Sequence, residues 1–223
     1  MGPSGVLEHA ADEAPLAAVT VVGYAASRAF DFAGDTVGQP PKGFVFGHTA
    51  KVGAPGTWVV QAEGSNQYLA QTNADSTNAR FPVAVVSDIS TADVDVSVRF
   101  RPVSGRVDQA AGLVWRYQNE DNYYLVRANA LEHNVVLYEV ERGRRTDLPL
   151  KGAGRTYGKA AKVPAGQWSI LRVVATGPRF EVFLNGVALY EVEDATFAAA
   201  GRVGVWTKAD SVTHFDDLTV VTR

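Results

Sequence analysis

The sequence has no cysteine among its 223 residues and only one methionine. The absence of cysteine excludes disulfide bonds, thiolate nucleophiles and zinc sites built on cysteine. No apolar run approaches the roughly 18 residues that span a membrane as a helix, so we expect no membrane span. A net charge of −3 lacks the basic excess of proteins that bind nucleic acid, and we expect no such partner.

Residues 1–26 are rich in alanine, with glycine, proline and acidic residues, and we interpret them as a tail or loosely attached arm. Within it, Val19 to Tyr24 could pair with a sheet edge. The arm lacks the basic start and continuous apolar core of a signal peptide. Residues 27–223 have an ordinary globular composition, and all-β sandwiches of about 200–250 residues often form one unit. We therefore expect a single domain over 27–223.

Short runs of β-forming residues recur along this domain. Residues 95–101 and 179–185 alternate between apolar and polar side chains, which is typical of strands with one wet face. The residues predicted to point inward are Val96, Val98, Phe100, Phe180, Val182 and Leu184. Other runs are apolar on both faces, which predicts central strands covered on both sides: 83–86, 111–114, 135–140 and 170–175.

Turn signals separate these runs. Residues 118–122 predict a short polar hairpin loop, and residues 141–143 end another strand. Asn185-Gly186 offers two residues that tolerate positive φ, as a tight type I′ hairpin requires. Many short strands with little helix predict an all-β, two-sheet antiparallel sandwich.

Several segments carry a family resemblance. They include AGLVWRYQNEDNYYLVRANALEHNVVLYEVERGRR (111–145), AGQWSILRVVATGPRFEVFLNGVALYEVED (165–194) and AGRVGVWTKADSVTHFDDLTV (200–220), with weaker likeness in 30–44 and 56–71. Together they resemble the bacterial 3-keto-disaccharide hydrolase-like family. That family belongs to the concanavalin A-like lectin/glucanase superfamily of laminin G-like jelly rolls. The resemblance implies a jelly-roll sandwich, a saccharide or glycoside on a concave sheet face, and a periplasmic or secreted location.

The fold alone does not choose the function, because this superfamily holds lectins, carbohydrate-binding modules, glycosidases, lyases and adhesion domains. The Glu-x-Asp-x-x-Glu motif of its retaining glycosidases is absent; the nearest acidic pairs are Glu139/Glu141 and Glu191/Glu193. Non-covalent recognition of a glycan or small glycoside is therefore our leading interpretation. The alternatives are a glycoside hydrolase or lyase acting on a keto-sugar or uronide, and a structural or protein-interaction domain without a sugar ligand.

The ligand surface is predicted from the hairpin of residues 115–129 and the loops that follow strands. If Tyr124 and Val126 face the core, then Tyr123, Arg127 and Asn129 face the other side. The aromatic rings would stack on sugar rings, and the planar polar groups would bind hydroxyls or a uronic carboxylate; alternatively, the aromatics pack within the protein. The predicted ligand-binding residues are Arg116, Tyr123, Arg127, Asn129, Glu132, Asn134, Trp206, Lys208 and Asp210.

In an enzyme, Glu132, His133 or Asp210 would act as acid or base, and an arginine would stabilise developing negative charge. The superfamily resemblance also implies a structural calcium ion, which Asp216 or Asp217 on the last strand could bind together with Asp31. We expect no other cofactor.

Overall fold

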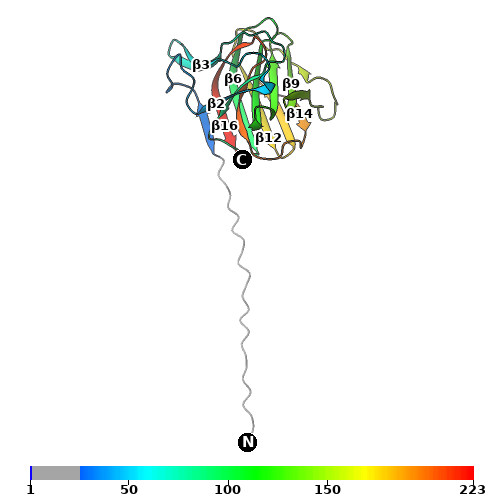
Figure 1. The fold of residues 1–223 in the computed structure, drawn as a ribbon. Coiled ribbons are helices and arrows are strands. Elements are labelled where there is room, and N and C mark those ends of the chain that lie inside the picture. The colour runs from blue at the N-terminus through cyan, green and yellow to red at the C-terminus, as the bar shows by residue number, and fades with distance from the viewer. Residues whose placement is uncertain (2–25) are drawn as a thin grey trace.

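The computed structural model describes residue 1 and residues 26–223; the expected edge pairing of Val19 to Tyr24 lies outside this part of the chain. Residues 26–223 form two antiparallel sheets packed face to face (Figure 1), with one short 3-10 turn at Thr49–Lys51. The predicted all-β sandwich is confirmed. Over the same residues, the structure contains no helix with the length and apolarity needed to cross a membrane.

Sheet A has the strand order β14-β13-β12-β6-β16-β4-β3, and β1 also pairs with β16. Its strands are β1 (Ser27–Phe30), β3 (Trp58–Glu63), β4 (Asn66–Gln71), β6 (Val94–Ser104), β12 (Ser169–Thr176), β13 (Arg179–Leu184), β14 (Val187–Glu193) and β16 (Val212–Thr222).

Sheet B has the order β10-β9-β8-β7-β15-β5-β2, and β11 also pairs with β9. Its strands are β2 (Phe44–His48), β5 (Pro82–Val86), β7 (Ala110–Asn119), β8 (Asn122–Asn129), β9 (Asn134–Glu141), β10 (Arg144–Asp147), β11 (Lys159–Ala160) and β15 (Arg202–Trp206).

The main core lies between the two sheets. It contains all the side chains that alternation predicted to point inward on β6 and β13. The Asn185-Gly186 hairpin is confirmed, with φ of 50° and 79° at its two residues. The prediction that residues 170–175 are covered on both sides is wrong: Ile170 is 45% exposed, because the outer face of sheet A meets solvent there.

Sheet B carries a second apolar cluster on its outer face. Its members include Phe81, Tyr123, Tyr138 and Trp206, all buried. The turn at Thr49–Lys51 lies against this face, because the Thr49 hydroxyl hydrogen-bonds the Tyr123 hydroxyl at 2.7 Å. Sheet B is therefore a middle layer, with core on one side and a loop-covered aromatic cluster on the other.

The outer face of sheet B is concave. Arg145 on β10 lies with its guanidinium carbon 5.7 Å from the ring centroid of Trp206 on β15. Three strands separate β10 from β15, so in a flat sheet they would lie roughly 19 Å apart. The two side chains meet because the sheet curls around the aromatic cluster.

Gly204 on β15 allows two neighbouring strands to approach closely. A Cβ there would collide with the carbonyl oxygen of Ala84 and would lie 2.6 Å from the Cα of Val85. We expect Gly204→Ala to lower the free energy of unfolding by about 1–3 kcal/mol, since backbone cannot yield as a flexible side chain can. Urea denaturation measures this. Gly34→Ala, where a Cβ meets nothing within 4 Å, should change stability by less than about 0.5 kcal/mol; equal effects of the two variants would contradict the explanation.

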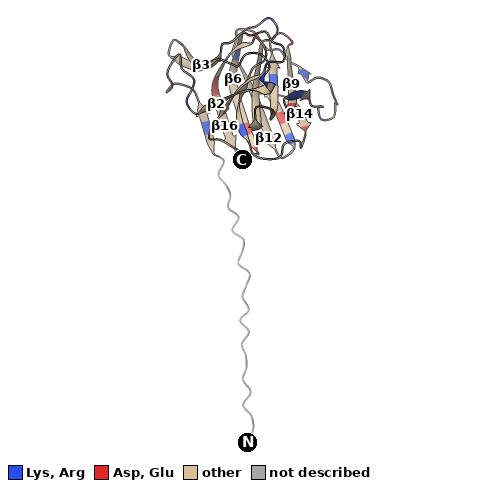
Figure 2. Cartoon of the chain, in the orientation of Figure 1, with Lys and Arg blue, Asp and Glu red and all other residues tan. Residues whose placement is uncertain are grey.

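Basic and acidic side chains are interspersed over the strands (Figure 2). Many pair across neighbouring strands of sheet A, as Arg172 does with Asp95 at 2.6 Å and Arg179 with Glu191 at 2.9 Å. These surface pairs align strands and contribute little stability each.

Candidate functional site

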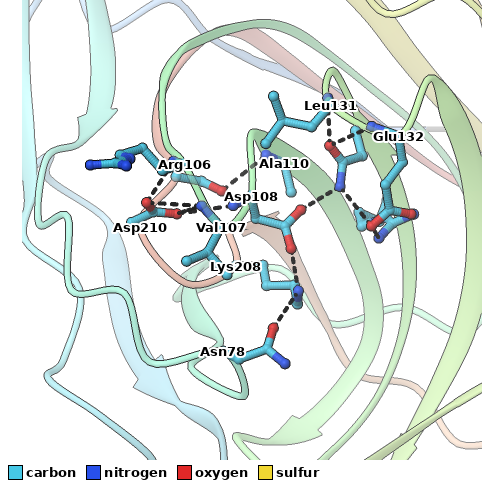
Figure 3. Close-up of polar contacts among 12 residues, drawn as sticks. Asn78, Arg106, Val107, Asp108, Ala110, Leu131, Glu132, Lys208 and Asp210 are labelled. Atoms are coloured by element: carbon cyan, nitrogen blue, oxygen red, sulfur yellow. Dashed lines mark hydrogen bonds and ion pairs between the residues drawn. The ribbon is translucent and has the colours of Figure 1, made fainter.

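A network of polar side chains occupies one end of sheet B (Figure 3). β8 ends at Asn129 and β9 begins at Asn134, and these two residues are register partners. β7 begins at Ala110, the partner of Asn129 on the other side. Trp206 at the end of β15 pairs with Gly112, so the loop after β15 reaches the same end. Antiparallel pairing thus gathers four strand ends and their loops in one place.

Asp108 is the buried centre of this network. Its carboxylate is 1% exposed and accepts hydrogen bonds from the Lys208 ammonium and from the Asn129 side-chain amide. Lys208 also donates to the Asn78 side-chain oxygen at 2.9 Å. Asn129 donates to Glu132 at 3.2 Å, which links the ion pair to the next part of the network. Burying charged groups costs less free energy when each of them has such partners.

Arg127 and Glu132 form the part of the network that reaches the surface. The Arg127 guanidinium is fully buried and donates to both Glu132 oxygens, at 3.2 and 2.9 Å, and to Asn134 Oδ1 at 2.5 Å. It also lies 5.8 Å from the ring centroids of Tyr138 and Tyr157. Its Nε is buried without a hydrogen-bond partner. The fully buried Arg127 therefore keeps one N–H without an acceptor and supports the carboxylate of Glu132, which is 38% exposed.

The charge of Glu132 follows from these contacts. Burial alone would raise the pKa of Glu132, but the hydrogen bonds and charge of Arg127, with help from Asn134, hold it below the ordinary value. Glu132 is therefore a carboxylate at neutral pH. That state suits an acceptor for sugar hydroxyls better than a proton donor.

Asp210 fixes the loop that carries Asp108. Its carboxylate accepts backbone N–H groups of Arg106 at 2.6 Å, Val107 at 3.1 Å and Asp108 at 3.0 Å (Figure 3). Burial alone would raise the pKa of Asp210, but these backbone hydrogen bonds hold it below the ordinary value. Asp210 therefore orients the loop rather than offering a free acid or base.

His133 lies apart from these contacts. It is exposed, has a φ of 50°, and borders a hollow of about 520 Å³ that Ala160, Ala161 and Lys162 also line. No hydrogen bond joins its ring to the other described residues of the network. The prediction that it serves as a base stays a prediction.

Two further hollows differ in their relation to the network. One of about 530 Å³ borders the Asp210 loop and is lined by Ser76, Ser104 and Arg106 among others. The other, about 620 Å³, lies on β13 and β14 of sheet A. Its charged residues Arg179 and Glu191 pair with each other on the surface. We regard the first as the more relevant hollow because buried polar groups stand beside it.

Tyr123 and Trp206 were predicted to stack on sugar rings, and the structure does not place them to do so. Both side chains face the concave side, as alternation predicts for Tyr123, but both are fully buried. The Tyr123 hydroxyl is taken by Thr49, and the Trp206 ring stacks on Phe81 at 5.4 Å. The two rings form the floor of the concave face.

The prediction that Arg116 belongs to the ligand surface is wrong. Its guanidinium donates to the carbonyl oxygens of Ala92 at 2.7 Å, Phe197 at 2.7 Å and Gly177 at 2.6 Å, away from the network. The physical reason is a bulge: the register of β7 shifts after Trp115, and Arg116 has a φ of 47°.

Three residues at the concave face of sheet B or at its loop end were not predicted from the sequence: Asp108, Arg145 and Tyr157. Asp108 stands just before the run that begins at Ala110, so its place at a strand end was a usable signal. Arg145 follows the Arg142-Gly143 turn and is the register partner of Val140, which places it on the concave face. Tyr157 comes from a loop, and its hydroxyl accepts a hydrogen bond from that of Tyr138 at 3.0 Å.

The calcium prediction finds little support in the side-chain arrangement. The Asp216 carboxylate accepts a hydrogen bond from the Asn66 side chain at 3.0 Å. The Arg99 guanidinium lies 3.6 Å from Asp216 and forms an ion pair with Asp217 at 2.9 Å. Asp31 instead accepts the backbone N–H of Ala33. Within residues 26–223, no group of three or more histidine or acidic side chains gathers as a metal site. A calcium ion here stays a prediction that these contacts do not favour.

A family model described as a 3-keto-alpha-glucoside-1,2-lyase-like domain matches residues 49–221. None of the curated proteins matches the sequence.

Several solved structures share the fold. The carbohydrate-binding module CBM66 from Bacillus subtilis is 18% identical, with a TM-score of 0.61 over 81% of this chain and 96% of its own. The cellulose-induced protein Cip1 is 14% identical, with a TM-score of 0.59 over 88% and 97%. Domain 4 of the extracellular arabinanase AbnA from Geobacillus stearothermophilus, in complex with arabinotriose, is 14% identical, with a TM-score of 0.57 over 89% and 93%. At these identities the likeness shows the jelly-roll fold.

Proposed function

The chain belongs to the family of 3-keto-alpha-glucoside-1,2-lyase-like domains, and from this premise we propose that it binds a saccharide at the loop end of the concave face of sheet B. Two structural neighbours are described as a carbohydrate-binding module and as a domain in complex with arabinotriose, which supports this class of ligand. The extracellular origin of the second also supports a periplasmic or secreted location, which we include in the proposal.

One observation carries the proposal: the buried Arg127 holds Glu132 and Asn134 in a fixed array with part of both groups at the surface. Sugar hydroxyls donate and accept at once, so they suit planar groups of both kinds that are already oriented. Pre-orientation also lowers the entropy lost on binding. Tyr157, 46% exposed beside Arg127, offers an apolar ring face for the C–H side of a pyranose.

A thermal-shift panel of mono-, oligo- and polysaccharides, including uronides, tests the proposal. A ligand that binds only the folded state raises the melting temperature by linkage. We expect at least one sugar to do so. No response to any sugar would sink the proposal and favour a structural or protein-interaction domain.

Glu132→Gln should weaken binding of the sugar found in this way by about tenfold, because a charge-assisted acceptor is replaced by a neutral one. Isothermal titration calorimetry below the melting temperature of each variant measures the effect. Glu141→Gln removes an exposed carboxylate at the opposite end of β9 and serves as the matched control. Equal affinities for the two variants would remove Glu132 from the site.

The family match favours one second candidate, a lyase or hydrolase acting on a keto-sugar at the same place. Glu132 is then the best-placed base, since it is ionised and partly exposed, whereas Asp108 and Asp210 are buried. Product analysis with the bound sugar and its 3-keto derivative separates the two candidates. Turnover that Glu132→Gln abolishes while binding persists would make the protein an enzyme; an absence of product with both sugars would leave recognition alone.

A further inference from the structure

Arg145 lies on the aromatic floor of the concave face. Its guanidinium carbon stands 4.4 Å from the ring centroid of Tyr138, 4.8 Å from that of Phe81 and 5.7 Å from that of Trp206. These rings come from β9, from the residue before β5 and from β15, so the side chain extends from the rim strand β10 across the hollow of the sheet. Aromatic faces attract a guanidinium and fix its plane.

The charge of Arg145 lacks the partner that the other cations of this face have. Arg127 pairs with Glu132 at 2.9 Å and Lys208 with Asp108. No carboxylate in the part of the chain that the structure describes forms an ion pair with Arg145, and its NH1 is buried without a hydrogen-bond partner. Asp147, also on β10, is engaged by Arg155 at 2.9 Å. A buried donor without an acceptor costs free energy. A ligand that supplies the acceptor would explain why Arg145 occupies this position.

We infer that Arg145 binds the carboxylate of a uronic acid, and that the saccharide ligand is therefore acidic. The inference rests on the proposed function and adds the class of sugar. A guanidinium presents a planar fork that matches a carboxylate with two parallel hydrogen bonds. Tyr138 has Arg145 near its ring at 4.4 Å and Arg127 at 5.8 Å, so the two guanidiniums border the same part of the face. A saccharide that extends past Tyr138 from Arg145 toward Arg127 would bring its hydroxyls to Glu132 and Asn134.

Oligosaccharides of uronic acids, each measured beside its methyl ester, test this assignment by calorimetry. Esterification removes the charge and leaves the ring and its hydroxyls in place. We expect one acid to bind at least about tenfold more tightly than its ester, the usual worth of a charge-assisted hydrogen bond. Arg145→Met should abolish this preference and change the affinity for the ester by less than about threefold.

Arg144→Met is the matched control, because Arg144 is the neighbouring residue of β10, exposed on the other face. It should keep the preference for the acid. Arg145→Lys retains the charge but loses the fork, and should keep only part of the preference. If Arg145→Met does not fold, salt titration of the wild-type protein replaces it: the affinity for the acid should fall with ionic strength while that for the ester stays constant.

The outcomes separate the inference from the proposed function. Saccharide binding without preference for any acid overturns the role of Arg145 and leaves the binding site standing. A preference that survives Arg145→Met, or an acid affinity insensitive to salt, likewise overturns it. A protein that binds no acid, no ester and none of the neutral sugars of the thermal-shift panel refutes both proposals together.

Discussion

Replacing Lys208 with methionine is expected to lower the free energy of unfolding by about 3–5 kcal/mol, the usual cost of breaking a buried ion pair from one side. Lys208 is 9% exposed, and its ammonium pairs with the carboxylate of Asp108, which is itself 1% exposed. The methionine chain fills similar volume but leaves a buried carboxylate whose remaining side-chain partner is Asn129. The same variant should lose saccharide binding, because the end of β8 at Asn129 and the following loop with Glu132 lose their anchor.

Urea denaturation at neutral pH measures the loss. The double variant Asp108→Asn/Lys208→Met should regain most of the stability, since it removes the orphaned charge together with its partner. Lys42→Met, at an exposed position, is the control and should shift stability by less than about 0.5 kcal/mol. A loss below about 1 kcal/mol for Lys208→Met would show that the ion pair does not hold this end of the sheet together.

Stability should also fall as the pH drops from about 6.5 to about 4, and His214 on β16 should account for much of the fall. Burial, with the nearby charge of Arg101, lowers the pKa of His214 from 6.5 to about 4, while Glu63 opposes the shift. The His214 ring stacks on Tyr68 with centroids 4.4 Å apart, and its Nδ1 accepts a hydrogen bond from Arg101 at 3.0 Å.

The sign follows from proton binding. Over this window the unfolded chain takes up a proton at His214 that the folded protein refuses, so acid favours unfolding. The shift in pKa corresponds to at most about 3 kcal/mol, fully present above pH 6.5 and lost by about pH 4.

Denaturation curves at several pH values, for the wild-type protein and His214→Asn, isolate this contribution from those of the carboxylates. Asparagine can still accept a hydrogen bond from Arg101, but its side chain does not bind a proton in this pH range. The variant should be the less stable protein at pH 7, and its stability should depend less steeply on pH between 6.5 and 4. His133→Asn, in an exposed loop, should retain the wild-type slope. Parallel pH profiles for wild type and His214→Asn would refute the assignment.

Alternation of apolar and polar residues predicted the sheets well, because it reports which face a side chain takes. The inward residues of β6 and β13 are in the core as expected. The same rule placed Tyr123 correctly on the other face of sheet B. It could not reveal that the turn at Thr49–Lys51 and Phe81 cover that face, since those residues come from distant parts of the chain.

Local spacing explains which part of the site was predictable. Arg127, Glu132 and Asn134 fall within one hairpin, so their meeting needs only the pairing of β8 with β9. Asp108 joins this group through Asn129, and Arg145 lies beside Tyr138, which Arg127 also borders; neither is visible in a single run of sequence. The prediction for Arg116 is wrong for a different reason, because a bulge in β7 turns its side chain away from the concave face.

The most direct test of the saccharide site is a nuclear magnetic resonance titration with the sugar that the thermal-shift panel selects. We expect saturable shifts of the Arg127 Nε–H and the Asn134 side-chain amide. The indole N–H of Trp168, which lies against Arg99 and Arg101 of sheet A, should stay unchanged. Saturable shifts at Trp168 with none at Arg127 would place the sugar on the opposite sheet and contradict the proposed site.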